Sequence, residues 1–197
     1  MQRIILAFLL FCVVQANAIY VSTSIGDSRI QSKNLIYKPG GIVHWALETG
    51  FFNEPENIID YKLGIGIDRF GYSHSDGDES VSLWELYFKP MIWSVTYQNV
   101  MLEFAPYAGI LIAGNNLNEY DEDLFFKVKF LEGGHIITIG YEYRLGYQIS
   151  NKYFVGLTAN YHYVPYGFQH YKPPSQVKKD LYLFGGWGLN FQYNLPF

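Results

Sequence analysis

The sequence predicts an all-β fold, an eight-stranded antiparallel up-and-down transmembrane β-barrel. Apolar and polar residues alternate with period two through most of the chain, and no sustained 3.6-residue pattern competes with this alternation. Short and long connections follow one another between the alternating segments. Tyrosine and phenylalanine are abundant, with 18 and 15 among 197 residues, and the apolar ring and polar tip of tyrosine suit a membrane interface. After residue 18 no apolar run approaches the roughly 20 residues of a membrane helix, so a spanning chain must close into a barrel.

Residues 1–18 predict a secretory signal peptide. Arg3 supplies the positive start, Ile4–Val14 the apolar core, and Ala16–Ala18 a small-x-small cleavage site. We therefore expect a single β-barrel domain over residues 19–197.

Charge and cysteine content limit the function classes. The chain has 14 basic and 18 acidic residues and a formal net charge of −4, without a basic cluster, so we expect no nucleic-acid partner. Its only cysteine, Cys12, lies in the predicted leader, and the expected domain therefore has no disulfide. We expect neither a cofactor nor a metal.

Eight segments carry the alternation. They run over Ile19–Gly26, Ile42–Phe52, Ile58–Phe70, Val81–Val95, Val100–Gly114, His135–Ile149, Lys152–Val164 and Leu181–Phe197. In the second, the apolar face holds Val43, Trp45, Leu47 and Phe51. In the third, the polar face holds Asp60, Lys62, Gly64, Gly66 and Asp68. The fourth and fifth contain Pro90 and Pro106, each of which removes a ladder hydrogen bond, so we expect bulges or bends there.

The connections alternate strictly in length. The short ones are Asn53–Asn57, Thr96–Asn99 and Ser150–Asn151. The long, polar ones are Asp27–Gly41, Gly71–Ser80, Asn115–Gly134 and Pro165–Asp180. This pattern is expected when one barrel end faces the periplasm and the other faces outside. Both termini then fall on the short-turn side, which gives an even strand count.

The last segment alternates most clearly and ends on an aromatic residue. Its outer face includes Phe191, Tyr193, Leu195 and Phe197. Here the chain resembles the C-terminal strand of bacterial outer-membrane proteins, whose alternating apolar residues and terminal aromatic are the signal for the barrel-assembly machinery. With the leader and the eight segments, the resemblance covers essentially the whole chain and is to the class of the OmpA transmembrane domain, OmpX and the opacity proteins. It implies a location in a Gram-negative outer membrane, in contact with lipid and lipopolysaccharide.

Two arrangements fit the alternation. A membrane barrel turns the apolar faces to lipid, whereas a lipocalin-like soluble barrel turns them inward around a ligand. Glycines lie largely on the polar faces, and an eight-stranded lumen has room only for modest side chains. Aromatic residues near the short-turn rim fit a membrane girdle; they are Phe51, Tyr147, Tyr153 and Tyr193. We therefore expect the membrane arrangement.

With the polar faces inside, a network of charges lies in the lumen. Its members are Glu48, Asp60, Lys62, Asp68, Glu85, Lys89, Glu103, Glu142 and Arg144, with His44 and His162 nearby. Buried charges must pair or hold water, and a guanidinium can bridge two carboxylates, so we expect Arg144 at the centre of a plug that fixes strand register. The alternative is a narrow cation-preferring channel lined by Glu48, Glu103, Glu142 and Arg144.

The long connections offer weaker signals. Ser73–Glu79 contains Ser, His and acidic residues, but adjacent residues rarely face one another. Neither His162 nor His170 begins the His-x-Ser-Asn pattern of the lipid A 3-O-deacylases, so a lipid A-modifying enzyme is the least favoured alternative and we expect no catalytic residue. The acidic stretch Glu119–Asp123 fits a solvated loop tip better than a calcium site. The connection 165–180 is basic and aromatic, which suits a surface partner or lipopolysaccharide phosphates.

These observations predict a non-enzymatic barrel that serves envelope integrity or surface interaction through four extracellular loops. The channel and the lipid A-modifying enzyme stay as alternatives.

Overall fold

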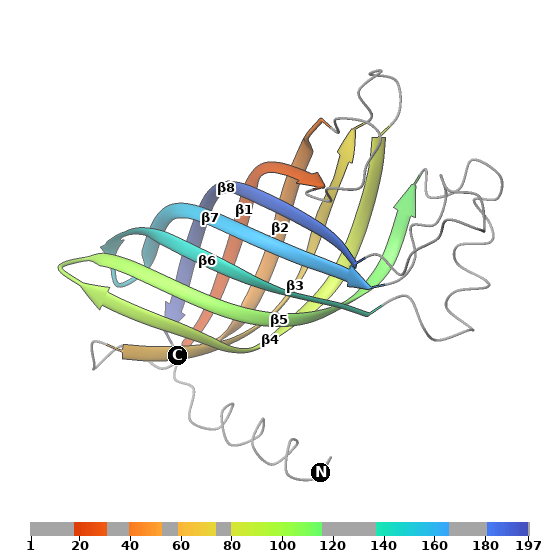
Figure 1. The fold of residues 1–197 in the computed structure, drawn as a ribbon. Coiled ribbons are helices and arrows are strands. Elements are labelled where there is room, and N and C mark those ends of the chain that lie inside the picture. The colour runs from red at the N-terminus through yellow and green to blue at the C-terminus, as the bar shows by residue number, and fades with distance from the viewer. Residues whose placement is uncertain are drawn as a thin grey trace, which may run out of the picture.

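The computed structural model describes residues 18–30, 40–52, 59–73, 80–115, 137–165 and 181–196. These residues form one closed barrel of eight strands, in which each strand pairs with its neighbours along the chain and the last pairs with the first (Figure 1). All pairings are antiparallel. The strands are β1 (Ala18–Ile30), β2 (Ile42–Phe52), β3 (Ile59–Ser73), β4 (Ser80–Tyr97), β5 (Val100–Asn115), β6 (Ile137–Ser150), β7 (Tyr153–Pro165) and β8 (Leu181–Pro196). The predicted fold class is therefore confirmed.

The strand bounds agree with the prediction to within a few residues. β2 coincides with its predicted range. The largest difference is at the end of β1, which continues to Ile30 where the sequence predicted Gly26 as the last residue. The extension follows from β8, which pairs with β1 as far as Ile30 and Phe184. Among the described residues no helix is long and apolar enough to cross a membrane.

Tight turns mark one end of the barrel, called the short-turn end below. Gln98 and Asn99 join β4 to β5 with φ angles of 46° and 68°, the left-handed pair of a type I′ hairpin turn, which matches the twist of the flanking strands. Asn151 and Lys152 join β6 to β7, one residue later than the predicted Ser150–Asn151. The predicted turn after β2 lies outside the described residues. β1, β3, β5 and β7 finish at the opposite end, called the long-loop end.

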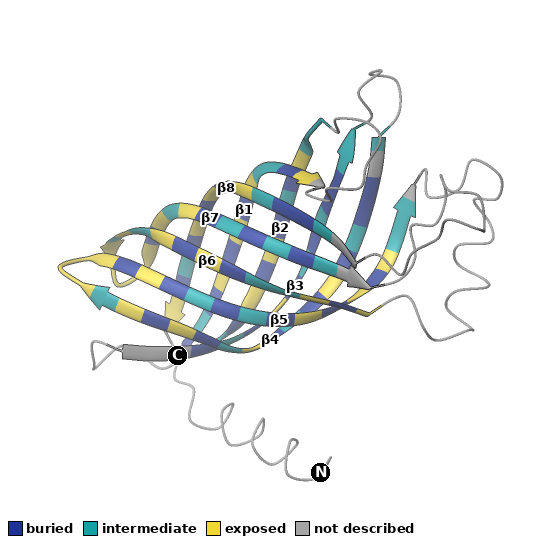
Figure 2. Cartoon of the chain, in the orientation of Figure 1, coloured by how far each residue is buried: buried dark blue, intermediate teal, exposed yellow. Residues whose placement is uncertain are grey.

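Burial alternates along every strand, as the bands of Figure 2 show. The outward side chains are large and apolar; Leu189, for example, is 60% exposed. The inward side chains include serines, glutamates, lysines and histidines that are nearly inaccessible. The apolar faces therefore point outward, as expected for a membrane barrel, because a soluble carrier would turn them to the lumen. At the short-turn rim, Tyr153 and Tyr193 pack with ring centroids 5.1 Å apart.

The irregularity expected at Pro90 is a bulge in β4. Lys62 of β3 pairs with Ile92, whereas Gly64 pairs with Lys89, so β4 has one residue more than its partner here. The extra residue reverses which side chains face inward. Lys89 is buried in the lumen before the bulge, and Ile92 is buried after it.

Pro106 in β5 lies opposite the same place. Phe88 pairs with Ala108, and Trp93 pairs with Phe104. Between these two pairs β4 advances by five residues while β5 advances by four, so β4 again has one residue more than its partner. Pairing of β5 with β6 continues past Pro106 without a shift. The two prolines thus share one bulge, where the missing backbone donors cost least.

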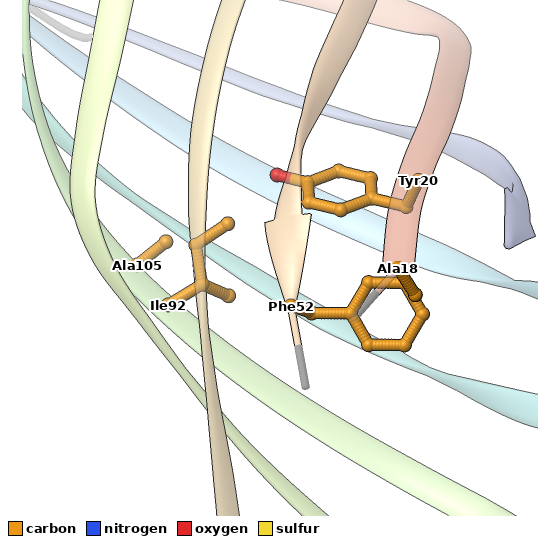
Figure 3. Close-up of a cluster of buried hydrophobic side chains, with 5 residues drawn as sticks. All are labelled: Ala18, Tyr20, Phe52, Ile92 and Ala105. Atoms are coloured by element: carbon orange, nitrogen blue, oxygen red, sulfur yellow. The ribbon is translucent and has the colours of Figure 1, made fainter. Parts of the chain in front are cut away.

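Apolar side chains lie on both sides of the polar lumen. Near the short-turn end a cluster projects inward from four strands (Figure 3) and consists of Ala18, Tyr20, Phe52, Ile92 and Ala105. Toward the long-loop end, Phe70 and Phe184 are fully buried, with ring centroids 5.1 Å apart. The charged part of the lumen lies between these two apolar groups.

Candidate functional site in the barrel lumen

The buried charges of the lumen form two groups. The first, called the ionic cluster, comes from five neighbouring strands, β2 to β6, and consists of Glu48, Lys62, Lys89, Glu103, Glu142 and Arg144. All of these side chains are buried. They were predicted to be luminal because each lies on the polar face of its strand.

Arg144 on β6 contacts all three carboxylates of the ionic cluster. Its Nη2 lies 3.0 Å from Glu48 Oε2, its Nε 2.5 Å from Glu142 Oε1, and its Nη1 3.5 Å from Glu103 Oε2. A planar guanidinium presents donors in several directions, and it can therefore bridge strands that lie on different sides of the lumen. The structure places Arg144 where the sequence expectation had it, at the centre of the pairs.

The two lysines complete the neutralisation. Lys89 pairs with Glu48 and, at 2.9 Å, with Glu142. Lys62 pairs with Glu103. Three carboxylates therefore meet three cations, and each carboxylate touches at least two of them. Charges buried in this way are tolerable only when such partners are present.

Glu48 accepts hydrogen bonds from tyrosines as well as cations. The Tyr20 hydroxyl donates to its Oε1 at 2.7 Å and the Tyr87 hydroxyl to its Oε2 at 2.9 Å. Glycines on β3 make room for both rings, because a Cβ at Gly64 would lie 2.3 Å from the Tyr20 hydroxyl and one at Gly66 would lie 2.5 Å from that of Tyr87. The absence of side chains at these two positions lets the hydroxyls cross the lumen.

The second group, called the histidine cluster, lies nearer the long-loop end. It consists of His44, Asp68, Glu85, Tyr107, Asn160 and His162. His162 Nδ1 lies 2.9 Å from Glu85 Oε2 and 2.7 Å from the Tyr107 hydroxyl. His44 Nε2 lies 2.7 Å from the Asn160 side-chain nitrogen. Both histidines face Asp68 Oδ2, at 3.8 Å from His44 Nε2 and 3.6 Å from His162 Nε2.

The structure therefore divides the predicted network. Asp68 and Glu85 were grouped with the lysines and Arg144, but among the described residues their ion pairs are with histidines. The backbone of Asp60 belongs to β3, and its side chain lies outside what the structure describes. The acid surplus expected for a cation channel does not occur within the ionic cluster, where acids and bases are equal in number.

The histidine cluster was not predicted as a site, although the sequence carries a signal for it. His44 is the third residue of its predicted segment, while Asp68 and His162 are each third from the end of theirs. In all three segments the third position is counted from the long-loop end. The three side chains therefore lie at a similar depth below that rim. Counting inward positions from the rim, rather than listing charges, would have grouped them.

The remaining sequence candidates lie at the barrel surface or beyond the described residues. Phe191 and Leu195 of the expected assembly signal are exposed and point outward, while Phe197 lies outside the described residues. Ser73 ends β3 and donates a hydrogen bond to the Gly41 carbonyl at 3.3 Å. Residues 74–79, 116–136 and 166–180, which hold the other loop candidates, are outside the described part of the chain.

The outer wall of the barrel, which surrounds both clusters, is apolar. An antiparallel closed barrel with an apolar exterior and a polar interior is the architecture of outer-membrane proteins. The described residues have this organisation, with an apolar group on each side of the polar part of the lumen, and the outer membrane is the location that it indicates.

No known protein-family model matches the sequence, and no curated protein matches it. Solved structures do. Neisserial surface protein A is 11% identical, with 89% of this chain and 96% of that chain covered, at a TM-score of 0.55. The outer membrane protein Ail of Yersinia pestis is 14% identical, with 91% and 99% covered, at a TM-score of 0.46. The outer membrane protein OprG of Pseudomonas aeruginosa is 10% identical, with 93% and 98% covered, at a TM-score of 0.42.

At this identity the comparison with neisserial surface protein A shows the fold and nothing more specific. It confirms that the chain is similar to small outer-membrane β-barrels, as its last strand and its loop alternation suggested. The function must be inferred from the chain's own residues.

Proposed function

We propose that this chain is a non-enzymatic outer-membrane barrel whose lumen is a structural plug and whose activity lies in its surface loops, serving envelope integrity or contact with another surface. The observation that carries the proposal is the ionic cluster. Its carboxylates are held by cations from neighbouring strands, so they cross-link the wall instead of lining a free path. An interior of this kind leaves the loops as the variable, accessible part of the molecule.

The composition of the fourth long connection supports a contact role. Residues 166–180 contain the aromatics Tyr166, Phe168 and Tyr171, and the bases His170, Lys172, Lys178 and Lys179. Aromatic rings anchor protein contacts, and lysines attract the phosphates of lipopolysaccharide. The alternating residues Phe191, Tyr193, Leu195 and Phe197 support assembly by the barrel machinery, as the resemblance implied.

A channel is the second candidate, and one strip of the lumen favours it. Neutral polar side chains line β1 and β8, including Ser22, Ser24, Asn190, Gln192 and Asn194. Asn190 Oδ1 and Gln192 Oε1 are buried without a hydrogen-bond partner. Buried polar atoms of this kind commonly hold water, so a thread of water along this strip is the route that a channel would use.

The loop proposal is tested by replacing residues 168–178 with a Gly-Ser linker of equal length in cells that carry the chain. We expect the variant to stay in the outer membrane and to shift on boiling in SDS gels like the parent barrel. It should lose either resistance to detergent and bile salts or binding of purified lipopolysaccharide. A matched variant with the strip residue Asn190→Ser, which leaves the loops intact, should keep both properties. If the linker variant behaves like the parent in both assays, the fourth loop is not the active part.

The enzymatic alternative has its own test. Lipid A from cells with and without the chain is compared by mass spectrometry, and we expect identical profiles. A mass change that depends on the chain would replace the proposal with a lipid A-modifying activity.

A further inference from the structure

We propose that the histidine cluster is a binding site for a divalent transition-metal ion, with His44, Asp68 and His162 as ligands, and that Zn²⁺ is the ion its donors fit best. The proposed function does not use this cluster. The site goes beyond that function, because a plug could be built from the ionic cluster alone.

Three strands bring the ligand atoms together across the lumen. His44 comes from β2, Asp68 from β3 and His162 from β7, and β7 is not a neighbour of the other two in the barrel. One ligand atom from each residue lies within 4.8 Å of the others. Zinc bonds of about 2.0–2.1 Å put the ligand atoms of a tetrahedral site about 3.3 Å apart. The observed 3.6 Å and 3.8 Å from the two Nε2 atoms to Asp68 Oδ2 are close to this spacing.

The hydrogen bonds around His162 leave its Nε2 lone pair directed at the site. The Tyr107 hydroxyl donates to the Tyr161 carbonyl at 3.0 Å, so toward His162 Nδ1 its oxygen is an acceptor. The other neighbour of Nδ1 is the Glu85 carboxylate at 2.9 Å, which also accepts. With the proton on Nδ1, directed at these two acceptors, Nε2 is free to bind a metal. A carboxylate behind a histidine in this way is the usual support of a zinc ligand.

His44 is oriented in the same sense. Its Nε2 lies 2.7 Å from the Asn160 amide nitrogen, and because that nitrogen is a donor, the contact fits an Nε2 lone pair that points into the lumen. A metal ion would replace that contact. The Asn160 Oδ1 atom has no hydrogen-bond partner, so the same side chain can turn an oxygen toward the ion as a fourth donor.

The cluster contains buried atoms that lack partners. His162 Nε2 and Asp68 Oδ1 have no hydrogen-bond partner, although His162 is only 1% and Asp68 only 3% exposed. An unsatisfied buried polar atom costs about 1–3 kcal/mol. A cation bound to Asp68 Oδ2 and the two Nε2 atoms would satisfy His162 Nε2 and neutralise the Asp68 carboxylate.

Charge points to a divalent cation. Among the described residues, no lysine or arginine pairs with Asp68 or Glu85, whose ion pairs are with His44 and His162 only. When both carboxylates are ionised and both imidazoles are neutral, a charge of +2 balances the cluster. Imidazole nitrogens with one carboxylate oxygen favour zinc or iron(II) over magnesium or calcium, which prefer oxygen ligands alone.

The ring of His162 is held in place before any ion arrives. Phe70 stacks on it with ring centroids 4.0 Å apart and planes at 12°. Phe184 packs against Phe70 from β8. A ligand fixed by packing loses little freedom on binding, and this preorganisation strengthens the site.

The test uses a background that isolates the luminal pair. The chain has five histidines, and His74, His135 and His170 are changed to Gln together. The folded barrel in detergent is dialysed against zinc, and the bound metal is counted by mass spectrometry and its affinity measured by calorimetry. We expect about one zinc ion for each chain. His162→Gln or Asp68→Asn should weaken binding by at least about 100-fold, and Glu85→Gln by about 10- to 100-fold.

Thr158→Val is the matched control, because it removes a luminal hydroxyl of β7 with little change of shape. It should leave zinc affinity unchanged. A background protein that binds no zinc would overturn the proposal, as would zinc affinity that His162→Gln leaves intact. Where a ligand variant fails the boiling-shift test for folding, X-ray absorption on the zinc-loaded background protein decides. Two imidazole ligands support the site, and a spectrum without imidazole overturns it.

Discussion

The ionic cluster and the histidine cluster occupy one lumen, yet they solve the problem of buried charge differently. Around Glu48, every carboxylate oxygen has a cation or a hydroxyl as partner. Around Asp68, one oxygen has no hydrogen-bond partner and the other faces two histidines at 3.6–3.8 Å. The surroundings of Glu48 are complete within the chain, and the two unpartnered atoms of the ionic cluster, Glu103 Oε2 and Arg144 Nε, each lie beside an opposite charge. The surroundings of Asp68 are completed by something from outside the chain, and this difference separates a structural group from a candidate binding site.

Removal of the central cation should have the largest effect. Arg144→Met leaves three buried carboxylates facing two lysines, and breaking a buried pair costs about 3–5 kcal/mol. Unfolding in urea from lipid vesicles should show a loss of that size. His162→Gln, measured without metal, should cost much less, because this change removes a neutral imidazole and not a buried cation. If the two variants lose equal amounts of unfolding free energy, the distinction between the clusters is wrong.

Two glutamates give a closer comparison. Glu48→Gln keeps the shape but leaves Arg144 and Lys89 with one carboxylate fewer, so we expect a loss of about 2–4 kcal/mol. Glu85→Gln changes the same atoms at a position whose hydrogen-bond partner is His162, and we expect about 1 kcal/mol or less. Urea midpoints of the two variants, measured side by side without metal, check the order. The reverse order would contradict the assignment of Glu48 to the self-neutralised group.

A glycine on β3 gives a smaller and more local effect. In Gly64→Ala the new methyl group meets the Tyr20 hydroxyl, whose oxygen lies 2.3 Å from the Cβ position, and overpacking of this kind costs about 1–3 kcal/mol. In the Tyr20→Phe background the obstructing atom is gone, so the same change should cost about 1 kcal/mol less. Urea unfolding of the four proteins gives the coupling. Additive losses of stability would show that the missing side chain at Gly64 does not make room for the Tyr20 hydroxyl.

Much of this fold could be predicted from the sequence, because every strand of a lipid-facing barrel alternates outward apolar residues with inward polar ones. The segment Ile42–Phe52 was predicted to the residue, and the inward position of Glu142 and Arg144 followed from parity alone. Pro90 marked the bulge in β4 because proline cannot donate to the ladder. The inward position of Ile92 could not be assigned, since it depends on which residue the bulge adds.

Apart from the grouping of His44, Asp68 and His162, the pairing of the charges could not be predicted from the sequence, for a different reason. Parity tells which side chains enter the lumen, but their depth depends on strand tilt and stagger, which belong to the closed barrel as a whole. Lys89 and Glu85 lie four residues apart on one face, yet Lys89 joins the ionic cluster and Glu85 the histidine cluster. A list of luminal charges therefore included the charged members of both clusters but could not divide them between the two.

The most direct test of the closed lumen is the conductance of the purified barrel in a planar lipid bilayer. Because the carboxylates of the ionic cluster are bound to cations of the same chain, we expect no ion-selective openings from the unaltered protein. We also expect no openings from the Thr158→Val variant. Reproducible cation-selective openings that Glu142→Gln abolishes would contradict this account and would make the lumen a channel.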